Sequence, residues 1–180
     1  MKFLEDVSKV SPNKLVFVDE SGLSIKMTRS FARARVGERV YGYIPGCWGE
    51  NLTIIGAMKI DGTSALMSLP GAANGEAFKA YVEHILVPSL RVDDVVVMDN
   101  LSIHKVIGIR EAIEGVGARI LFLPPYHPDL NPIEKMWSKL KTIMRGLEAR
   151  TFIALETALS NAINYIRPRD ALAWFKHCGY

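Results

Sequence analysis

The clearest pattern along the chain is a pair of short apolar runs, each followed at once by an acidic residue. Apolar side chains fill positions 15–18 and 95–98, and Asp19 and Asp99 come directly after these runs. Continuous apolar runs of this length are typical of strands that are buried on both faces of a sheet. The pattern therefore predicts two buried strands, each with a carboxylate at its carboxyl end.

Other periodic segments complete the predicted set of elements. Residues 51–60 and 63–69 are β-rich runs separated by Asp61-Gly62, a strong hairpin signal. The arginine- and glycine-rich stretch before them predicts loop with a short strand. The predicted elements are a strand at 14–19, a turn at Glu20-Ser21-Gly22, the hairpin, a helix capped by Asn74, a strand at 95–98, a helix from Ser102 to about Glu114, a strand at 118–123, helices from Pro132 to about Arg145 and from Thr151 to about Ile166, and an amphipathic tail from Asp170.

Three antiparallel strands, a helix, a strand, a helix, a strand and terminal helices form the element order of a ribonuclease H-like α/β fold. We expect a mixed five-stranded sheet flanked by helices, in a single domain over residues 1–180. In that fold the first and fourth strands are parallel neighbours, so Asp19 and Asp99 should lie side by side. Carboxylates so close raise one another's pKa unless a cation neutralises them, and this favours a divalent-metal site.

A third carboxylate, Glu134, follows Asp99 after 34 intervening residues. The proline-rich residues 124–128 should be extended, because proline restricts both itself and the residue before it. Asn131 is interpreted as a helix N-cap, with Pro132 as the first helical residue and Glu134 as the third. Glu134 could serve only in a capping box with Asn131, but three carboxylates on three rigid elements favour the metal site.

Composition limits the classes of protein that remain. Hydrophobic residues make up 49% of the 180 residues and the mean hydropathy is +0.12, values that fit a globular core. No apolar stretch approaches the roughly 20 residues of a membrane span, and the first residues lack the apolar run of a signal peptide. We therefore expect a cytoplasmic protein without membrane contact. Cys47 and Cys178 lack CxxC spacing and are interpreted as free thiols.

The net charge of +3 is unevenly distributed. Basic residues dominate positions 26–39 and the segment after Glu134, whereas acidic residues dominate positions 91–134. Basic flanks around an acidic centre suit a polyanion that is brought to bound cations. The alternative is an ordinary solvated helix face with alternating charge.

Three blocks of sequence resemble the catalytic blocks of mariner-superfamily transposases, particularly the bacterial insertion-sequence branch, a group of DDE superfamily endonucleases. The blocks read VDES at 18–21, MDNLSIHK at 98–105 and PPYHPDLNPIE at 124–134, and HCGY at 177–180 is similar to the family's ending. The 34-residue gap is also common in this family. The resemblance covers most of the chain.

The resemblance implies that Asp19, Asp99 and Glu134 are catalytic and bind two Mg²⁺ or Mn²⁺ ions. Such ions activate the attacking water or DNA 3′-hydroxyl and stabilise the leaving oxygen in an in-line phosphoryl displacement. The implied partners are DNA, as transposon ends and target, and a second copy of the chain in a homodimer on DNA. A nucleoid-associated location and no small-molecule substrate are also implied.

Full-length members of the family carry an N-terminal helix-turn-helix domain that reads transposon ends, and we expect it to be absent from this chain. Weak DNA binding through phosphate contacts is then expected. One alternative is a catalytically silent DNA-binding or dimerisation remnant of a transposase. Another is a small phosphatase with Asp19 as nucleophile, which is disfavoured because Ser21 stands where such enzymes carry a second aspartate.

Several further residues stay open between a site role and a structural one. Asn100 and His104 either touch the scissile phosphate or orient Asp99, or they are turn and helix-start residues. Glu20 is left out, because it should point away from Asp19 along the strand. Residues that are either DNA contacts or ordinary surface and core residues are His127, Arg33, Arg35, Lys135, Lys139, Lys141, Trp48 and Trp137.

Overall fold

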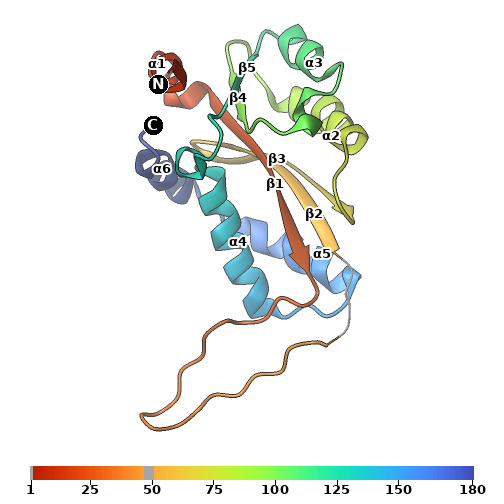
Figure 1. Ribbon diagram of the computed structural model, residues 1–180, viewed down its shortest axis with the longest axis vertical. Coiled ribbons are helices and arrows are strands. Elements are labelled where there is room, and N and C mark those ends of the chain that lie inside the picture. Colours follow the sequence, from red (N-terminus) through yellow and green to blue (C-terminus); the bar gives the residue numbers. More distant parts are fainter. Residues whose placement is uncertain (1, 47–50) are drawn as a thin grey trace.

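The computed structural model describes residues 2–46 and 51–180, and in this part of the chain five strands form one mixed sheet in the order β3-β2-β1-β4-β5 (Figure 1). The first three strands are antiparallel, whereas β1–β4 and β4–β5 are parallel pairs. The predicted meander, the parallel pairing of first and fourth strands and the strand number are confirmed. The strands are β1 (Leu15–Ser24), β2 (Asn51–Lys59), β3 (Gly62–Pro70), β4 (Val95–Met98) and β5 (Arg119–Phe122).

Strand β1 is longer than the sequence predicts. The expected turn at Glu20-Ser21-Gly22 is wrong, because β1 continues to Ser24 while it pairs with β2. Turn-type residues are held in extended form here by the partner strand, which overrides their local preference. Strand β4 ends much earlier, with Val97 opposite Phe17 the last pair between the two strands. Beyond Phe17, no other strand of the described chain pairs with this edge of β1.

The described residues also form six α-helices. Their side-chain caps confirm two predicted starts, since Asn74 Oδ1 accepts from the Ala77 amide at 2.8 Å and Thr151 Oγ1 accepts from the Ala154 amide at 3.2 Å. The helices are α1 (Lys2–Val7), α2 (Gly75–Tyr81), α3 (Ile109–Gly115), α4 (Ile133–Leu147), α5 (Phe152–Ala162) and α6 (Pro168–His177).

The predicted helix from Ser102 to Glu114 is wrong in its first half. A short 3-10 turn occupies Ser102–Lys105, and α3 begins only at Ile109. Gly108 separates the two segments with a φ of 97°, a left-handed conformation that ends any helix arriving from Ser102. The short strand expected in the arginine-rich stretch is also absent from the described residues 25–46, which leave the sheet as a long arm in Figure 1.

Side chains of the sheet pack into two cores, one on each face. Phe17 packs with Trp137 and Phe175 beneath α4, α5 and α6, and Val16 packs with Phe78 beneath α2 and α3. Successive residues of β1 alternate between these cores, as expected of a strand buried on both faces. Asp19 therefore faces the α4 side and Glu20 the α2 side. Cys178 is a buried free thiol, as predicted, and Cys47 lies outside the described residues.

Candidate active site

Asp19, Asp99 and Glu134 line one cavity of about 500 Å³. They come from three different elements, namely strand β1, the turn after β4 and the first turn of α4. The remaining wall is the segment from Leu123 to Pro128 together with Asn100, Leu101 and Asn131. We call this the acidic cavity, because its lining carries three carboxylates and neither lysine nor arginine.

Asp19 is fixed by two hydrogen bonds. Its Oδ1 accepts from the Glu20 amide at 2.8 Å, and its Oδ2 accepts from the indole Nε1–H of Trp137 at 3.3 Å. Trp137 is only 2% exposed, so its expected core position is confirmed. The indole fits because Gly56 is the β2 partner of Asp19. A Cβ on Gly56 would lie 2.8 Å from Trp137 Cη2, a clash that glycine avoids.

The environment of Asp19 disfavours its charged form. Burial and then the nearby charge of Glu134 raise the pKa of Asp19 from 3.8 to about 7, with smaller contributions from Glu20 and Asp99. An opposite charge in this cavity would reverse the effect, because a cation stabilises the carboxylate form. The electrostatics of Asp19 thus suit a site that receives a positive ion.

Asp99 is held by a buried histidine. His104 Nδ1 lies 2.8 Å from Asp99 Oδ1, and the Leu101 amide donates to the same oxygen at 3.0 Å. On the other side of the ring, His104 Nε2 lies 2.8 Å from Glu20 Oε1. His104 is 1% exposed and its ring centroid lies 4.4 Å from that of Phe78, so water has little access to these contacts.

The contacts of His104 set its charge. Burial favours the neutral ring, but hydrogen bonds to Asp99 and Glu20 outweigh it and raise the pKa of His104 to about 10. The imidazolium in turn acts on Asp99. Although burial opposes its ionisation, the hydrogen bonds from His104 and Leu101 lower the pKa of Asp99. A buried cation therefore bridges two carboxylates and leaves Asp99 Oδ2 facing the cavity without a hydrogen-bond partner in the described chain.

Sequence reasoning missed Glu20 as part of this arrangement. The alternation along β1 correctly directs Glu20 away from Asp19, but the residue meets His104 on the other face of the sheet. The partners lie 84 positions apart, so no local spacing connects them. The only available signal is the histidine itself, which follows Asp99 by five residues, a spacing that lets it orient Asp99.

The segment before Glu134 differs from its prediction in two respects. Residues 124–128 are not uniformly extended, because Tyr126 adopts a φ of 61° in a turn. Asn131 also does not cap α4 with its side chain. Helix α4 begins at Ile133, and the Glu134 amide donates to the backbone oxygen of Asn131 at 3.2 Å. Glu134 still lies on the first turn, as its second residue.

Asn131 has an unusual environment in this segment. It is 5% exposed, and its Oδ1 has no hydrogen-bond partner in the described structure. Buried amide oxygens are normally paired, since an unpaired one costs about 1–3 kcal/mol. Tyr180 stabilises the same loop by donating its hydroxyl to the Leu130 oxygen at 2.7 Å. The loop thus buries an unsatisfied oxygen on a residue that lines the acidic cavity.

The donor set fits a hard divalent cation. The acidic cavity offers carboxylate oxygens, which are ligands that Mg²⁺ and Mn²⁺ prefer, and Asn131 with its unpaired amide oxygen is one of the lining residues. Glu134 has no hydrogen bond or ion pair in the described chain and is free to turn. Among the described residues, however, no three histidine, cysteine, aspartate or glutamate side chains are already close enough to hold a metal. The carboxylates share a cavity but keep apart, as like charges do.

The remaining predicted residues are distributed unevenly. Asn100 and His127 line the acidic cavity. Lys139 does not, and its Nζ pairs with Asp170 Oδ2 at 2.6 Å. Lys135 is exposed on α4 away from the cavity lining. Arg33 and Arg35 are exposed on the arm formed by residues 25–46, and Trp48 lies outside the described residues.

One family of known proteins matches most of the chain. The model of the DDE superfamily endonuclease family matches residues 14–156. No curated protein matches the sequence. The described helices include none that is long and apolar enough to cross a membrane.

Three solved structures illustrate the likeness in fold. The pre-cleavage Mos1 transpososome matches with a TM-score of 0.73 and 14% identity, over 98% of this chain and 56% of that one. The Mos1 Strand Transfer Complex gives 0.75 and 16%, over 98% and 55%, and the catalytic domain of Mos1 mariner transposase gives 0.64 and 13%, over 98% and 83%. The chain thus spans little more than half the length of the chains in the complexes, and the predicted ribonuclease H-like fold is confirmed.

Proposed function

Because the chain belongs to the DDE superfamily endonucleases, we propose that it is the catalytic domain of a transposase that cuts DNA at transposon ends and transfers the 3′-hydroxyl strand to target DNA. The observation that carries this proposal is the acidic cavity, in which three carboxylates from β1, the turn after β4 and α4 share one space. We also propose that the chain belongs to the bacterial insertion-sequence branch, which its sequence resembles.

In this proposal Asp19, Asp99 and Glu134 hold two Mg²⁺ or Mn²⁺ ions, and the Asn131 amide oxygen is a further donor at the wall. When bound, the ions supply Lewis-acid activation of the attacking oxygen and charge stabilisation of the leaving one. The chain itself orients the carboxylates. His104 fixes the direction of Asp99, and the indole of Trp137 fixes Asp19.

The proposed partner is DNA, both the transposon ends and the target, with two copies of the chain acting together because two ends must be joined. Structures titled as a transpososome and as a Mos1 mariner paired end complex with Mn support this choice of partner. Recognition of end sequences is assigned to a helix-turn-helix that these residues do not supply. A location at the nucleoid in the cytoplasm is part of the same proposal.

The test combines metal binding with cleavage. Thermal unfolding with and without Mn²⁺ should show a metal-induced rise in Tm for the wild type and none for Asp99→Ala. Nicking of a supercoiled plasmid in Mn²⁺ should follow the same pattern, with Lys135→Ala as a matched surface control that behaves like the wild type. If Mn²⁺ does not change the Tm and no nicking occurs, the chain is instead a catalytically silent remnant of a transposase. This is the second candidate, because no three carboxylates of the described chain are already close enough to hold a metal.

A further inference from the structure

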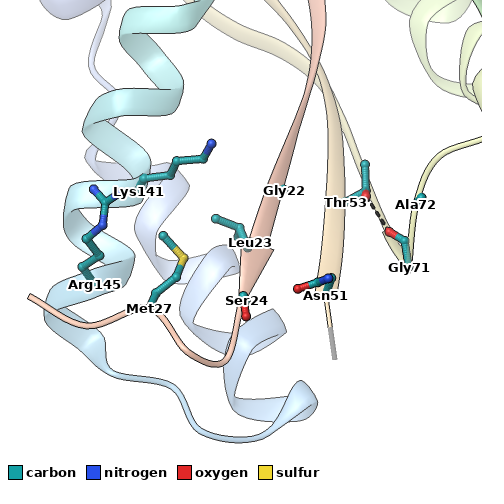
Figure 2. Close-up of a pocket in the computed structure, with 10 residues that line it drawn as sticks. All are labelled: Gly22, Leu23, Ser24, Met27, Asn51, Thr53, Gly71, Ala72, Lys141 and Arg145. Carbon is teal, nitrogen blue, oxygen red and sulfur yellow. Dashed lines mark hydrogen bonds between the residues drawn. The ribbon is translucent and has the colours of Figure 1, made fainter. Parts of the chain in front are cut away.

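A second cavity, of about 470 Å³, lies farther along α4 and β1 (Figure 2). Gly22 and Ser24 at the end of β1 form part of its wall, and Lys141 and Arg145 of α4 form another part. Figure 2 shows the amino group of Lys141 extending from α4 toward β1. No acidic residue lines this space, so we call it the basic cavity.

The basic cavity and the acidic cavity lie on the same stripe of α4. Lys141 follows Glu134 by seven residues and Arg145 by eleven, which places each of them within about 20° of Glu134 around the helix axis. Lys135 lies about 100° away from this stripe and Lys139 about 140° away, by the same geometry. This explains why Lys135 and Lys139 line neither cavity, whereas Lys141, the third lysine that the sequence offers as a DNA contact or a surface residue, lines the basic cavity.

The cations of the basic cavity lack counter-charges. Lys141 and Arg145 are half-buried, and neither has a hydrogen bond or an ion pair in the part of the chain that the structure describes. Arg29 adds a third positive charge close by, since its Nη2 donates only to the neutral backbone oxygen of Gly146 at 3.3 Å. Cations that are partly withdrawn from water without a partner favour the binding of an anion.

The wall on the β1 side is open to such a ligand. Among the described strands, none pairs with the β4 side of β1 beyond Phe17, so no strand covers this edge of the wall. Gly22 lacks a side chain, and a Cβ built on it would meet no atom within 4 Å. The charged groups that line this cavity, a lysine and an arginine, are groups that proteins use to hold phosphate.

The distance between the cavities follows separately from the rise per residue of α4 and from that of β1. Along α4, Lys141 and Arg145 lie about 10 and 16 Å beyond Glu134 at 1.5 Å per residue. Along β1, Gly22 and Ser24 lie about 10 and 16 Å beyond Asp19 at roughly 3.3 Å per residue. One DNA strand advances about 3.4 Å per nucleotide along a duplex axis, so this span corresponds to about three to five nucleotides.

We propose that the basic cavity binds backbone phosphates of DNA about three to five nucleotides from the phosphate that reacts in the acidic cavity. This inference rests on the proposed function and adds the path that the DNA takes along α4. The contact is independent of sequence, because phosphates carry no base information. It positions the strand, and the acidic cavity carries the chemistry.

The first test is the double variant Lys141→Ala/Arg145→Ala. We expect its Kd for duplex DNA to rise about tenfold or more, and the slope of log Kd against log salt to fall by about two, since two phosphate contacts are lost. The double variant Lys135→Ala/Lys176→Ala removes the same charge from exposed positions and should change Kd less than twofold. An equal loss in both variants would overturn the proposal.

Gly22 offers a second test that leaves the cations in place. Gly22→Asp adds a carboxylate to the wall and should weaken DNA binding about fivefold or more, whereas Gly22→Ala adds only a methyl group to open space and should leave the Kd unchanged. Both variants should keep the metal-induced rise in Tm. Unchanged binding by Gly22→Asp would contradict a phosphate site here.

A scan with neutral methylphosphonate linkages locates the contact. In duplexes with methylphosphonates at random positions, the molecules nicked by the wild type should carry fewest neutral linkages at three to five nucleotides from the cut bond, and this pattern should vanish in Lys141→Ala/Arg145→Ala. A minimum elsewhere on the strand would refute the assignment. If the wild type shows neither nicking nor a metal-induced Tm shift but Lys141→Ala/Arg145→Ala still lowers the salt slope by about two, the catalytic proposal fails while the phosphate site stands.

Discussion

The acidic cavity and the basic cavity share two walls, β1 and α4, and have similar volumes, yet their charged groups are held in opposite ways. In the acidic cavity, Asp19 and Asp99 are fixed by an indole N–H and a buried imidazolium. In the basic cavity, Lys141 and Arg145 are unpaired within the described chain. Groups that act at bonding distance are oriented in advance, whereas groups that attract a polyanion keep the freedom to follow its backbone.

The largest difference between the two cavities is expected from a substitution of Asp99. Asp99→Ala should reduce Mn²⁺-dependent nicking by at least about 10³-fold, because an oriented carboxylate ligand is lost. Its Kd for DNA in the absence of divalent ions should stay within about twofold of the wild type, since the basic cavity is intact. Steady-state nicking and fluorescence anisotropy measure the two effects. Retained nicking would show that the two cavities do not divide the tasks in this way.

Orientation itself is tested at His104. His104→Ala leaves Glu20 without its buried partner and should lower the free energy of unfolding by about 3 kcal/mol in urea titrations. It should also raise the Mn²⁺ concentration for half-maximal Tm shift, because Asp99 is no longer fixed. His104→Asn is the matched variant, since its amide can still donate to Asp99. Equal Mn²⁺ dependence of both variants would indicate that His104 serves the fold alone.

In the absence of divalent ions, the closeness of the carboxylates should make the free energy of unfolding depend on pH. The folded-state pKa of Asp19 is about 7, above its ordinary value of 3.8, so the folded protein binds this proton more tightly than the unfolded chain. The stability from this group is full below pH 4 and is lost as the pH rises toward 7. Asp19→Asn should therefore be more stable than the wild type at pH 8, by the order of 2 kcal/mol.

Chemical denaturation of both proteins from pH 4 to pH 8 in the presence of a chelator provides the measurement. The gap between Asp19→Asn and the wild type should open as the pH rises and should reverse when Mn²⁺ is added, because only the wild type then gains a ligand. A constant gap over this range would argue against crowding in the acidic cavity.

The smallest effect is expected at Asn131. Asn131→Ala removes the unpaired amide oxygen from the wall and should weaken Mn²⁺ binding about tenfold in isothermal titration, as loss of a supporting oxygen does at other metal sites. Asn131→Asp supplies an anionic oxygen at the same position and should restore or increase the affinity. Equal weakening by both variants would show that Asn131 only shapes the loop.

Much of the architecture is readable from sequence because it depends on local patterns. Apolar runs that end before Asp19 and Asp99, and the Asp61-Gly62 turn, predict the strands, and the order of the elements matches a ribonuclease H-like fold, in which the first and fourth strands are neighbours. The contact of Glu20 with His104 was not predictable in this way, since it joins residues 84 positions apart. Nor was the length of β1, because Glu20 and Gly22 are turn-type residues that only pairing with β2 keeps extended.

The choice among the lysines shows a further limit of the sequence. The helical period places Lys141 and Arg145 on the stripe of Glu134, but it does not tell which stripe of α4 runs beside β1. That orientation comes from burial of Trp137 and Leu140 against the sheet, a property of the packed protein. Similarly, the sequence around Asn131 matches the N-cap pattern, but the Glu134 amide donates to the backbone oxygen of Asn131 and not to its side chain.

Gly56 illustrates how a position without any chemical group can decide the outcome of a mutational screen. A single added methyl would meet Trp137 and Leu66 at less than 3 Å, and the displaced indole would take its N–H away from Asp19. A library scored for DNA cleavage would thus mark position 56 as intolerant, beside the acidic residues themselves. A library scored only for expression would mark it more leniently, and the difference between the two maps would reveal residues that shape the catalytic carboxylates from behind.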